Sequence, residues 1–138
     1  MIIVDTNVIS EMMKPSPAPH VSAWLDQQET ADLFITTVTI AEISYGLNAL
    51  PKGYRRSDLE EAFHNAVNEG FQHRILSFDE PAAYAYGNLM AQRKAAGRPL
   101  GVCDGQIAAI ARLHSHAIAT RNIRDFADCN LELINPFE

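Results

Sequence analysis

Short apolar runs alternate along the chain with longer stretches whose apolar residues recur at helical spacing. Short runs rich in aliphatic and β-branched residues are typical of buried strands in a parallel sheet. We expect strands at residues 1–4, 33–36, 74–77, 117–120 and 131–134, the last at a sheet edge. Helical periodicity, with proline or glycine near several ends, predicts helices at residues 8–13, 18–28, 40–50, 57–69, 81–96 and 102–114.

This order of elements indicates an α/β fold. Strands that alternate with helices are joined by right-handed crossovers into a mostly parallel sheet with helices on both faces. The 138 residues are enough for one domain with a hydrophobic core. Neither a repeat nor a low-complexity linker divides the chain, so we expect a single domain spanning residues 1–138.

The composition is typical of a globular protein. Hydrophobic residues make up 47% of the chain and charged residues 20%, and no apolar run is long enough to cross a bilayer. The first residues lack the basic region and cleavage site of a signal peptide, so we expect a cytoplasmic location and no membrane partner. Cys103 and Cys129 form no CxxC motif and are expected to be reduced. Although Cys103 lies beside Asp104, we interpret it as a small buried apolar residue rather than a catalytic thiol.

The net charge of −6 argues against a simple nucleic-acid-binding protein. That argument weakens where carboxylates surround divalent cations, which cancel their charge locally. The basic residues gather in three groups, and each group alone is better explained as a solvated face than as a phosphate contact. These groups are Arg55–Arg56, Arg93–Lys94 with Arg98, and Arg121 with Arg124.

Three carboxylates stand where a strand ends or a helix begins: Asp5, Glu42 and Asp104. The carboxyl ends of parallel strands share one sheet edge, which is where open α/β sheets bind their ligands. Each residue also has a simpler explanation. Asp5 could cap the following helix, for which Thr6 or Asn7 is the other candidate cap. Glu42 could complete a capping box with Thr39, and Asp104 could interact favourably with a helix dipole.

Taken together, the three carboxylates suggest a divalent-cation site. Crowded carboxylates raise one another's pKa unless a cation lies between them. Mg²⁺ and Mn²⁺ prefer oxygen ligands and can activate water for attack on a phosphodiester. Asn122 and Asp125, which follow the strand at 117–120, could complete such a site or simply cap a short helical turn.

Motifs for several other chemistries are absent. The chain has no GxGxxG, GxxxxGK[ST], GxSxG or HExxH sequence, so nucleotide, hydrolase-elbow and zinc-protease sites are unsupported. A phosphotransfer domain with paired aspartates after its first strand is also disfavoured, because Asn7 stands where the second aspartate is expected.

Three segments resemble one protein family in their order and separation: MIIVDTNVISE, TTVTIAEISYGL and VCDGQIAAIARLHSHAIATRNIRDF. They are similar to the PIN-domain ribonucleases, and most of all to VapC-type toxins of type II toxin–antitoxin systems, including the FitB-like branch. The resemblance covers essentially the whole chain. It implies a three-layer α/β/α sandwich with a mostly parallel sheet of four to five strands. It also implies an Mg²⁺- or Mn²⁺-dependent endoribonuclease that cleaves RNA, often tRNA.

The resemblance also implies roles for particular residues. The metal-binding positions of the family match Asp5, Glu42 and Asp104. At its fourth polar position Asn122 stands where some relatives carry an acid, and Asp125 is the nearest carboxylate. We expect Asn122 or Asp125 to assist through a hydrogen bond or a water molecule.

Two threonines and one glycine complete this comparison. Thr6 and Thr120 are expected to support the ligating carboxylates through their hydroxyl groups. Gly105 stands where the family more often carries alanine, and it should loosen the helix start by about 0.5–1 kcal/mol without removing the neighbouring ligand.

The family further implies a homodimer silenced by a cognate antitoxin. A C-terminal segment of the antitoxin would cover the site. The DNA-binding domain of the antitoxin would bind operator DNA as part of the larger toxin–antitoxin complex. We expect the helices at 18–28, 57–69 and 81–96 to line the groove for that segment. The alternative function is a non-catalytic PIN-like module that binds RNA or protein without a metal ion.

Overall fold

A parallel sheet lies at the centre of the molecule in the computed structural model, which describes residues 1–138. Its strands are β1 (Ile2–Val4), β2 (Leu33–Thr36), β3 (Ile75–Leu76), β4 (Ala117–Ala119) and β5 (Leu133–Ile134). All neighbouring strands pair in parallel, in the order β3-β2-β1-β4-β5. The central strand β1 therefore ends between β2 and β4, and the residues that follow these three strands meet at one edge.

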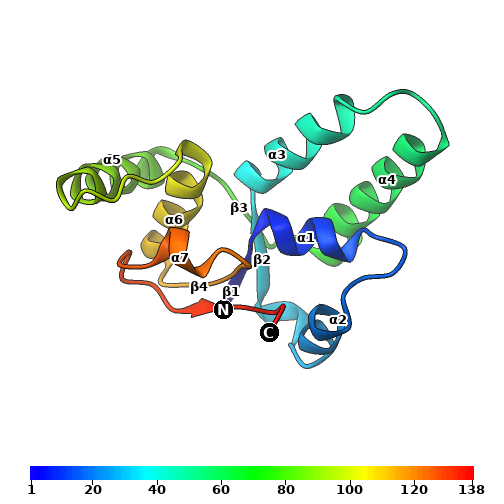
Figure 1. The fold of residues 1–138 in the computed structure, drawn as a ribbon, viewed down its shortest axis with the longest axis horizontal. Coiled ribbons are helices and arrows are strands. Elements are labelled where there is room, and N and C mark those ends of the chain that lie inside the picture. Colours follow the sequence, from blue (N-terminus) through cyan, green and yellow to red (C-terminus); the bar gives the residue numbers. More distant parts are fainter.

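Seven α-helices flank this sheet (Figure 1). They are α1 (Thr6–Met12), α2 (Pro19–Asp26), α3 (Thr37–Asn48), α4 (Tyr54–Asn65), α5 (Glu80–Ala95), α6 (Val102–His114) and α7 (Ile123–Phe126). Figure 1 shows α1 to α4 on one side of the sheet and α5 to α7 on the other. The predicted α/β/α sandwich with a mostly parallel sheet of four to five strands is confirmed, and the sheet has five strands that all pair in parallel.

Alternating side chains of the central strand feed two hydrophobic cores. Ile3 packs with Leu89 of α5 and Ile107 of α6 on one face of the sheet. Val4 packs on the opposite face, in a cluster that includes Val8 of α1 and Val21 of α2. This alternation is what a strand buried on both faces requires, and it explains the unbroken apolar run at the start of the chain.

Helices α1 and α3 begin two and three residues earlier than predicted, and each follows a capping residue at the end of a strand. Helix α1 starts at Thr6 because Asp5, rather than Thr6 or Asn7, is its N-cap and accepts a hydrogen bond from the Thr6 amide. Helix α3 starts at Thr37 because the Thr36 side chain accepts from the Thr39 amide. The capping box that would have explained Glu42 is therefore wrong, since Glu42 lies in the second turn of α3.

The remaining boundaries lie close to those predicted. The strand at 33–36 and the helix at 102–114 are confirmed without change. The helix predicted at 57–69 begins three residues earlier at Tyr54 and ends at Asn65, where a π-helical turn (Ala66–Gly70) continues it. A 3₁₀ turn (Thr30–Asp32) before β2 was not predicted. No helix has the length and apolar character that crossing a membrane would need.

The three helices proposed as walls of one groove do not lie together. Helix α5 packs on α6, whereas α2 contacts α1 and α4 contacts α3. Figure 1 shows α5 at the opposite side of the sheet from α2 and α4. A hollow of about 300 Å³ instead lies between α1, α3 and α4, where Ser10, Ile43 and Leu59 line it.

Gly105 permits the close approach of α5 and α6. The residue is buried, and a Cβ atom added there would lie 2.5 Å from Met90 Sδ and 3.0 Å from Tyr86 Cε2. The expectation that glycine merely loosens the helix start is therefore incomplete, because this glycine also leaves room for the neighbouring helix.

Alanine substitutions at two helical glycines should separate these effects. Gly87 on α5 is exposed, and a Cβ atom added there would meet open space, so Gly87→Ala should stabilise the protein by about 0.5–1 kcal/mol. Gly105→Ala should be about 1–3 kcal/mol less favourable than Gly87→Ala because Met90 and Tyr86 must move. Urea unfolding monitored by circular dichroism measures both. Equal gains in stability for the two variants would show that Met90 and Tyr86 move aside with no loss of unfolding free energy.

Candidate active site

Asp5 is buried at the carboxyl end of β1, with only 3% of its surface exposed. One carboxylate oxygen, Oδ1, accepts a hydrogen bond of 2.8 Å from the Thr6 amide. The other, Oδ2, accepts from Thr120 Oγ1 at 2.7 Å and from Asn7 Nδ2 at 3.3 Å. Pairing of β1 with β4 brings Thr120 across from Asp5, although 115 positions separate the two residues in sequence. Asp5 is therefore both the cap of α1 and a fixed carboxylate at the sheet edge.

Glu42 reaches the same edge from α3. Its Oε1 accepts a hydrogen bond of 2.7 Å from Thr6 Oγ1. The Thr6 and Thr39 hydroxyl oxygens lie 2.9 Å apart and share a further hydrogen bond. Thr6 thus contacts two carboxylates at once, Asp5 through its amide and Glu42 through its hydroxyl.

Asp104 lies in the first turn of α6, and its pKa is raised to about 6. Burial is the largest cause, followed by the negative charges of Asp5, Asp125 and Glu42. Burial also raises the pKa of Asp5, although hydrogen bonds from Thr120 and Thr6 oppose the increase. Four carboxylates from separate elements are therefore close enough to repel one another.

The structure places Asp125 and Asn122 differently. The negative charge of Asp125 on α7 helps to raise the pKa of both Asp5 and Asp104. Asn122 precedes α7 with an exposed side chain, and its backbone amide donates to Thr120 Oγ1 at 3.0 Å. Asp125 therefore belongs to the acidic cluster, whereas Asn122 is tied to it through Thr120.

Two further residues, Asn7 and Thr39, hold this cluster together and were not predicted from the sequence as site residues. Asn7 donates to both Asp5 Oδ2 and Thr120 Oγ1 at 3.3 Å, and its Oδ1 accepts from the Arg121 amide. Thr39 supports the Thr6 hydroxyl. A polar side chain two residues after Asp5 was the available signal for Asn7. Nothing in the sequence indicated that Thr39 faces Thr6.

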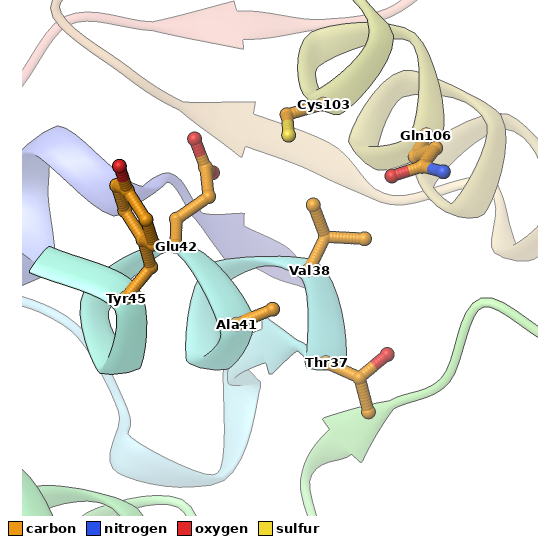
Figure 2. Close-up of a pocket in the computed structure, with 7 residues that line it drawn as sticks. All are labelled: Thr37, Val38, Ala41, Glu42, Tyr45, Cys103 and Gln106. Atoms are coloured by element: carbon orange, nitrogen blue, oxygen red, sulfur yellow. The ribbon is translucent and has the colours of Figure 1, made fainter. Parts of the chain in front are cut away.

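Glu42 borders open space on the side facing α6. A pocket of about 550 Å³ lies between α3 and α6, and Glu42, Tyr45 and Cys103 are among its lining residues. Figure 2 shows Cys103 on α6 across from Glu42, with the Tyr45 ring beside Glu42. Burial and the charges of Glu42 and Asp104 raise the pKa of the Cys103 thiol. That environment favours the neutral thiol, which agrees with the interpretation of Cys103 as non-catalytic.

The donor atoms of the cluster suit a hard divalent cation. Asp5, Glu42, Asp104 and Asp125 offer only carboxylate oxygens, the type that Mg²⁺ and Mn²⁺ prefer. Their mutual repulsion is the condition that a cation would relieve. No three acidic, histidine or cysteine side chains are gathered closely enough to form a ready cage. The residues therefore fit the ion by chemistry, and coordination would require the carboxylates to move closer together.

The chain belongs to the PIN-domain family, whose defining pattern matches residues 2–130. It is 41% identical over 138 residues to the VapC ribonuclease Y4jK of Sinorhizobium fredii, in a match that covers 100% of this chain and 99% of that protein. It is 37% identical over 137 residues to the toxin FitB of Neisseria gonorrhoeae, covering 99% of each. The solved structure of FitAB bound to an IR36 DNA fragment matches with a TM-score of 0.93 and 37% identity, over 100% of this chain and 96% of that one. These matches confirm the resemblance to VapC-type and FitB-like toxins.

Proposed function

We propose that this protein is a metal-dependent endoribonuclease that acts as the toxin of a toxin–antitoxin pair. The observation that carries the proposal is the convergence of four carboxylates on one sheet edge, with the pKa of Asp104 raised by burial and by the other three. Strongly perturbed carboxylates in an accessible position are typical of functional sites. A ribonuclease and a toxin among relatives that match the whole chain support the same activity.

In this proposal Asp5, Glu42 and Asp104 hold Mg²⁺ or Mn²⁺. Such an ion, when bound, lowers the pKa of a water molecule and neutralises charge that develops on a phosphodiester during hydrolysis. Thr120 and Asn7 keep the Asp5 carboxylate in place through hydrogen bonds to Oδ2.

Two further residues would prepare the site for substrate. Thr6 orients Glu42 by donating to Oε1 at 2.7 Å. Asp125 adds negative charge at the edge next to Asp104 and could position water by accepting a hydrogen bond.

Cleavage of total RNA with and without a chelator tests the proposal directly. The purified protein should cut RNA internally when Mn²⁺ or Mg²⁺ is added and should be inactive in EDTA. Calorimetric titration with Mn²⁺ should show binding to the wild type. Cleavage that persists in EDTA would contradict the metal-dependent mechanism. RNA binding with neither Mn²⁺ binding nor cleavage would instead support a non-catalytic module.

We also propose that an antitoxin segment occupies the hollow between α1, α3 and α4. This hollow extends to Glu42, so a bound segment would reach the acidic cluster. Hydrogen exchange in the presence of an antitoxin peptide should protect α3 and α4, while α2 remains unprotected. Protection confined to α5 would contradict this placement. Operator DNA would then be bound through the antitoxin, as part of the larger complex.

We propose that the protein acts on RNA as a homodimer in the cytoplasm. Tyr84 of α5, Tyr45 of α3 and Val102 of α6 are 76%, 79% and 61% exposed. Exposed apolar side chains mark an interaction surface where they form a contiguous patch, and the proposal requires a second copy of the chain to cover these three. Sedimentation of the isolated protein measures its oligomeric state, and a strictly monomeric protein would contradict the proposal.

A further inference from the structure

A third pocket opens beside the acidic cluster, and its lining is mostly charged rather than apolar. It encloses about 520 Å³ where the end of α5, the start of α6 and α7 meet. Its charged lining residues are Arg93, Arg98, Arg124, Asp104 and Asp125. Asp104 and Asp125 also belong to the acidic cluster, so the pocket adjoins the proposed cleavage site directly.

Arg93 is a buried cation without a carboxylate partner. Only 5% of its surface is exposed. Its guanidinium donates to the backbone carbonyls of Arg98 at 2.7 Å and Asp125 at 3.3 Å, and also to the carbonyl of Ala127. These bonds tie α7 to the end of α5, and none of the ion pairs in the structure involves Arg93. A buried charge is screened less by solvent and acts over a longer distance than a solvated one.

Arg124 is the free cation of the pocket. Its side chain is exposed and forms none of the ion pairs in the structure, which involve Lys14, Arg56, Arg98 and Arg121. Arg98, by contrast, is paired with Asp128. The first turn of α6 adds a weaker attraction for anions, because Gly101 provides no side-chain cap for its amides. The pocket thus combines a buried, hydrogen-bonded cation with an exposed one that forms no ion pair.

We propose that this pocket binds an RNA phosphate that neighbours the phosphodiester to be cleaved, and that Arg124 contacts it. The planar guanidinium matches two phosphate oxygens at once, which a solvated ammonium does not. This inference rests on the proposed ribonuclease function, because that function places a phosphodiester beside Asp104. Arg93 acts as a positioning residue that fixes α7 and hence Arg124. A phosphate held here would set which bond of the strand reaches the acidic cluster, without reading its sequence.

Binding of a fluorescein-labelled single-stranded RNA in EDTA tests the inference without requiring cleavage. Arg124→Gln should weaken binding about tenfold at low salt, and the slope of log affinity against log salt should fall by about 0.7. Arg112→Gln is the matched control, because it removes one charge eight residues beyond Asp104 on α6. It should change affinity less than about twofold. Arg124→Lys should retain part of the salt dependence. Melting temperatures should not change, since Arg124 is exposed.

Kinetics separate this inference from the proposed function. With Mn²⁺ present, Arg124→Gln should raise KM for RNA more than it lowers kcat. Equal RNA affinities for Arg124→Gln and Arg112→Gln would overturn the phosphate site even if the wild type cleaves RNA. A wild type that binds RNA through Arg124 without ever cutting it would overturn the ribonuclease instead. If Arg124→Gln lost binding of an antitoxin peptide while its RNA binding stayed unchanged, the phosphate site would be overturned and the pocket assigned to a protein partner.

Discussion

Asp5→Asn and Asp5→Ala are both expected to reduce RNA cleavage at least about 100-fold, yet they should differ clearly in stability. Loss of a metal-binding carboxylate removes several kcal/mol of transition-state stabilisation, and each 1.36 kcal/mol corresponds to about a factor of ten in rate. Asparagine keeps an acceptor oxygen near the Thr6 amide and removes a buried charge, so its stability should stay within about 1 kcal/mol of wild type.

Alanine at the same position removes every acceptor. The α1 cap loses its hydrogen bond from Thr6, and the side chains of Thr120 and Asn7 lose their common acceptor. A lost cap and one or two unsatisfied buried donors together cost about 2–3 kcal/mol. Thermal unfolding in EDTA should therefore place Asp5→Ala clearly below Asp5→Asn.

The exposed Asp26 on α2 supplies the control for both variants. Asp26→Asn should change neither RNA cleavage nor melting temperature. Undiminished cleavage by Asp5→Asn would remove Asp5 from the proposed mechanism. Equal stabilities of the asparagine and alanine variants would mean that the hydrogen bonds to Asp5 contribute little to the fold.

Much of the site was predictable because the carboxyl ends of parallel strands converge. The apolar run before Asp5 predicted the strand, and its neighbours β2 and β4 bring α3 and Thr120 to the same edge. The start of α3 was predicted wrongly because Thr36 and Thr39 are both acceptable capping residues. Local sequence alone does not choose between them, whereas the end of β2 does.

The relative positions of Asn122 and Asp125 could not be predicted for a different reason. They depend on the orientation of α7, which Arg93 fixes through the carbonyls of Asp125 and Ala127, 32 and 34 positions away in sequence. Every residue carries a backbone carbonyl that can accept a hydrogen bond, so the amino-acid sequence does not show which carbonyls Arg93 will contact. The charge of Arg93 was visible in the sequence, but its burial and its hydrogen bonds were not.

Asp104→Asn should abolish RNA cleavage and, without divalent ions, make the protein more stable above pH 6. The pKa of Asp104 is raised from 3.8 to about 6 in the folded protein, so folding disfavours its charged form. Such a difference is worth at most about 3 kcal/mol. Solvent screening of a half-buried side chain reduces this to about 1 kcal/mol, or about 4 °C in melting temperature.

The pH dependence gives this prediction its sign. Between pH 3.8 and about 6 the folded wild type binds more protons at Asp104 than the unfolded chain, so its stability decreases as pH rises through that window. The asparagine variant lacks this dependence. The advantage of Asp104→Asn should therefore be near zero at about pH 4 and complete by about pH 7. Calorimetric melting of both proteins across this range measures it, and an advantage that grows toward low pH would contradict the argument.

Adding Mn²⁺ should reverse the order of the two proteins. A ligand that binds only the folded state raises its melting temperature, and the wild type keeps the Asp104 carboxylate that the variant has lost. The repulsion that weakens the free protein would then be the same property that allows a cation to bind. If Mn²⁺ stabilised Asp104→Asn as strongly as wild type, Asp104 would not be a ligand, and its raised pKa would reflect crowding alone.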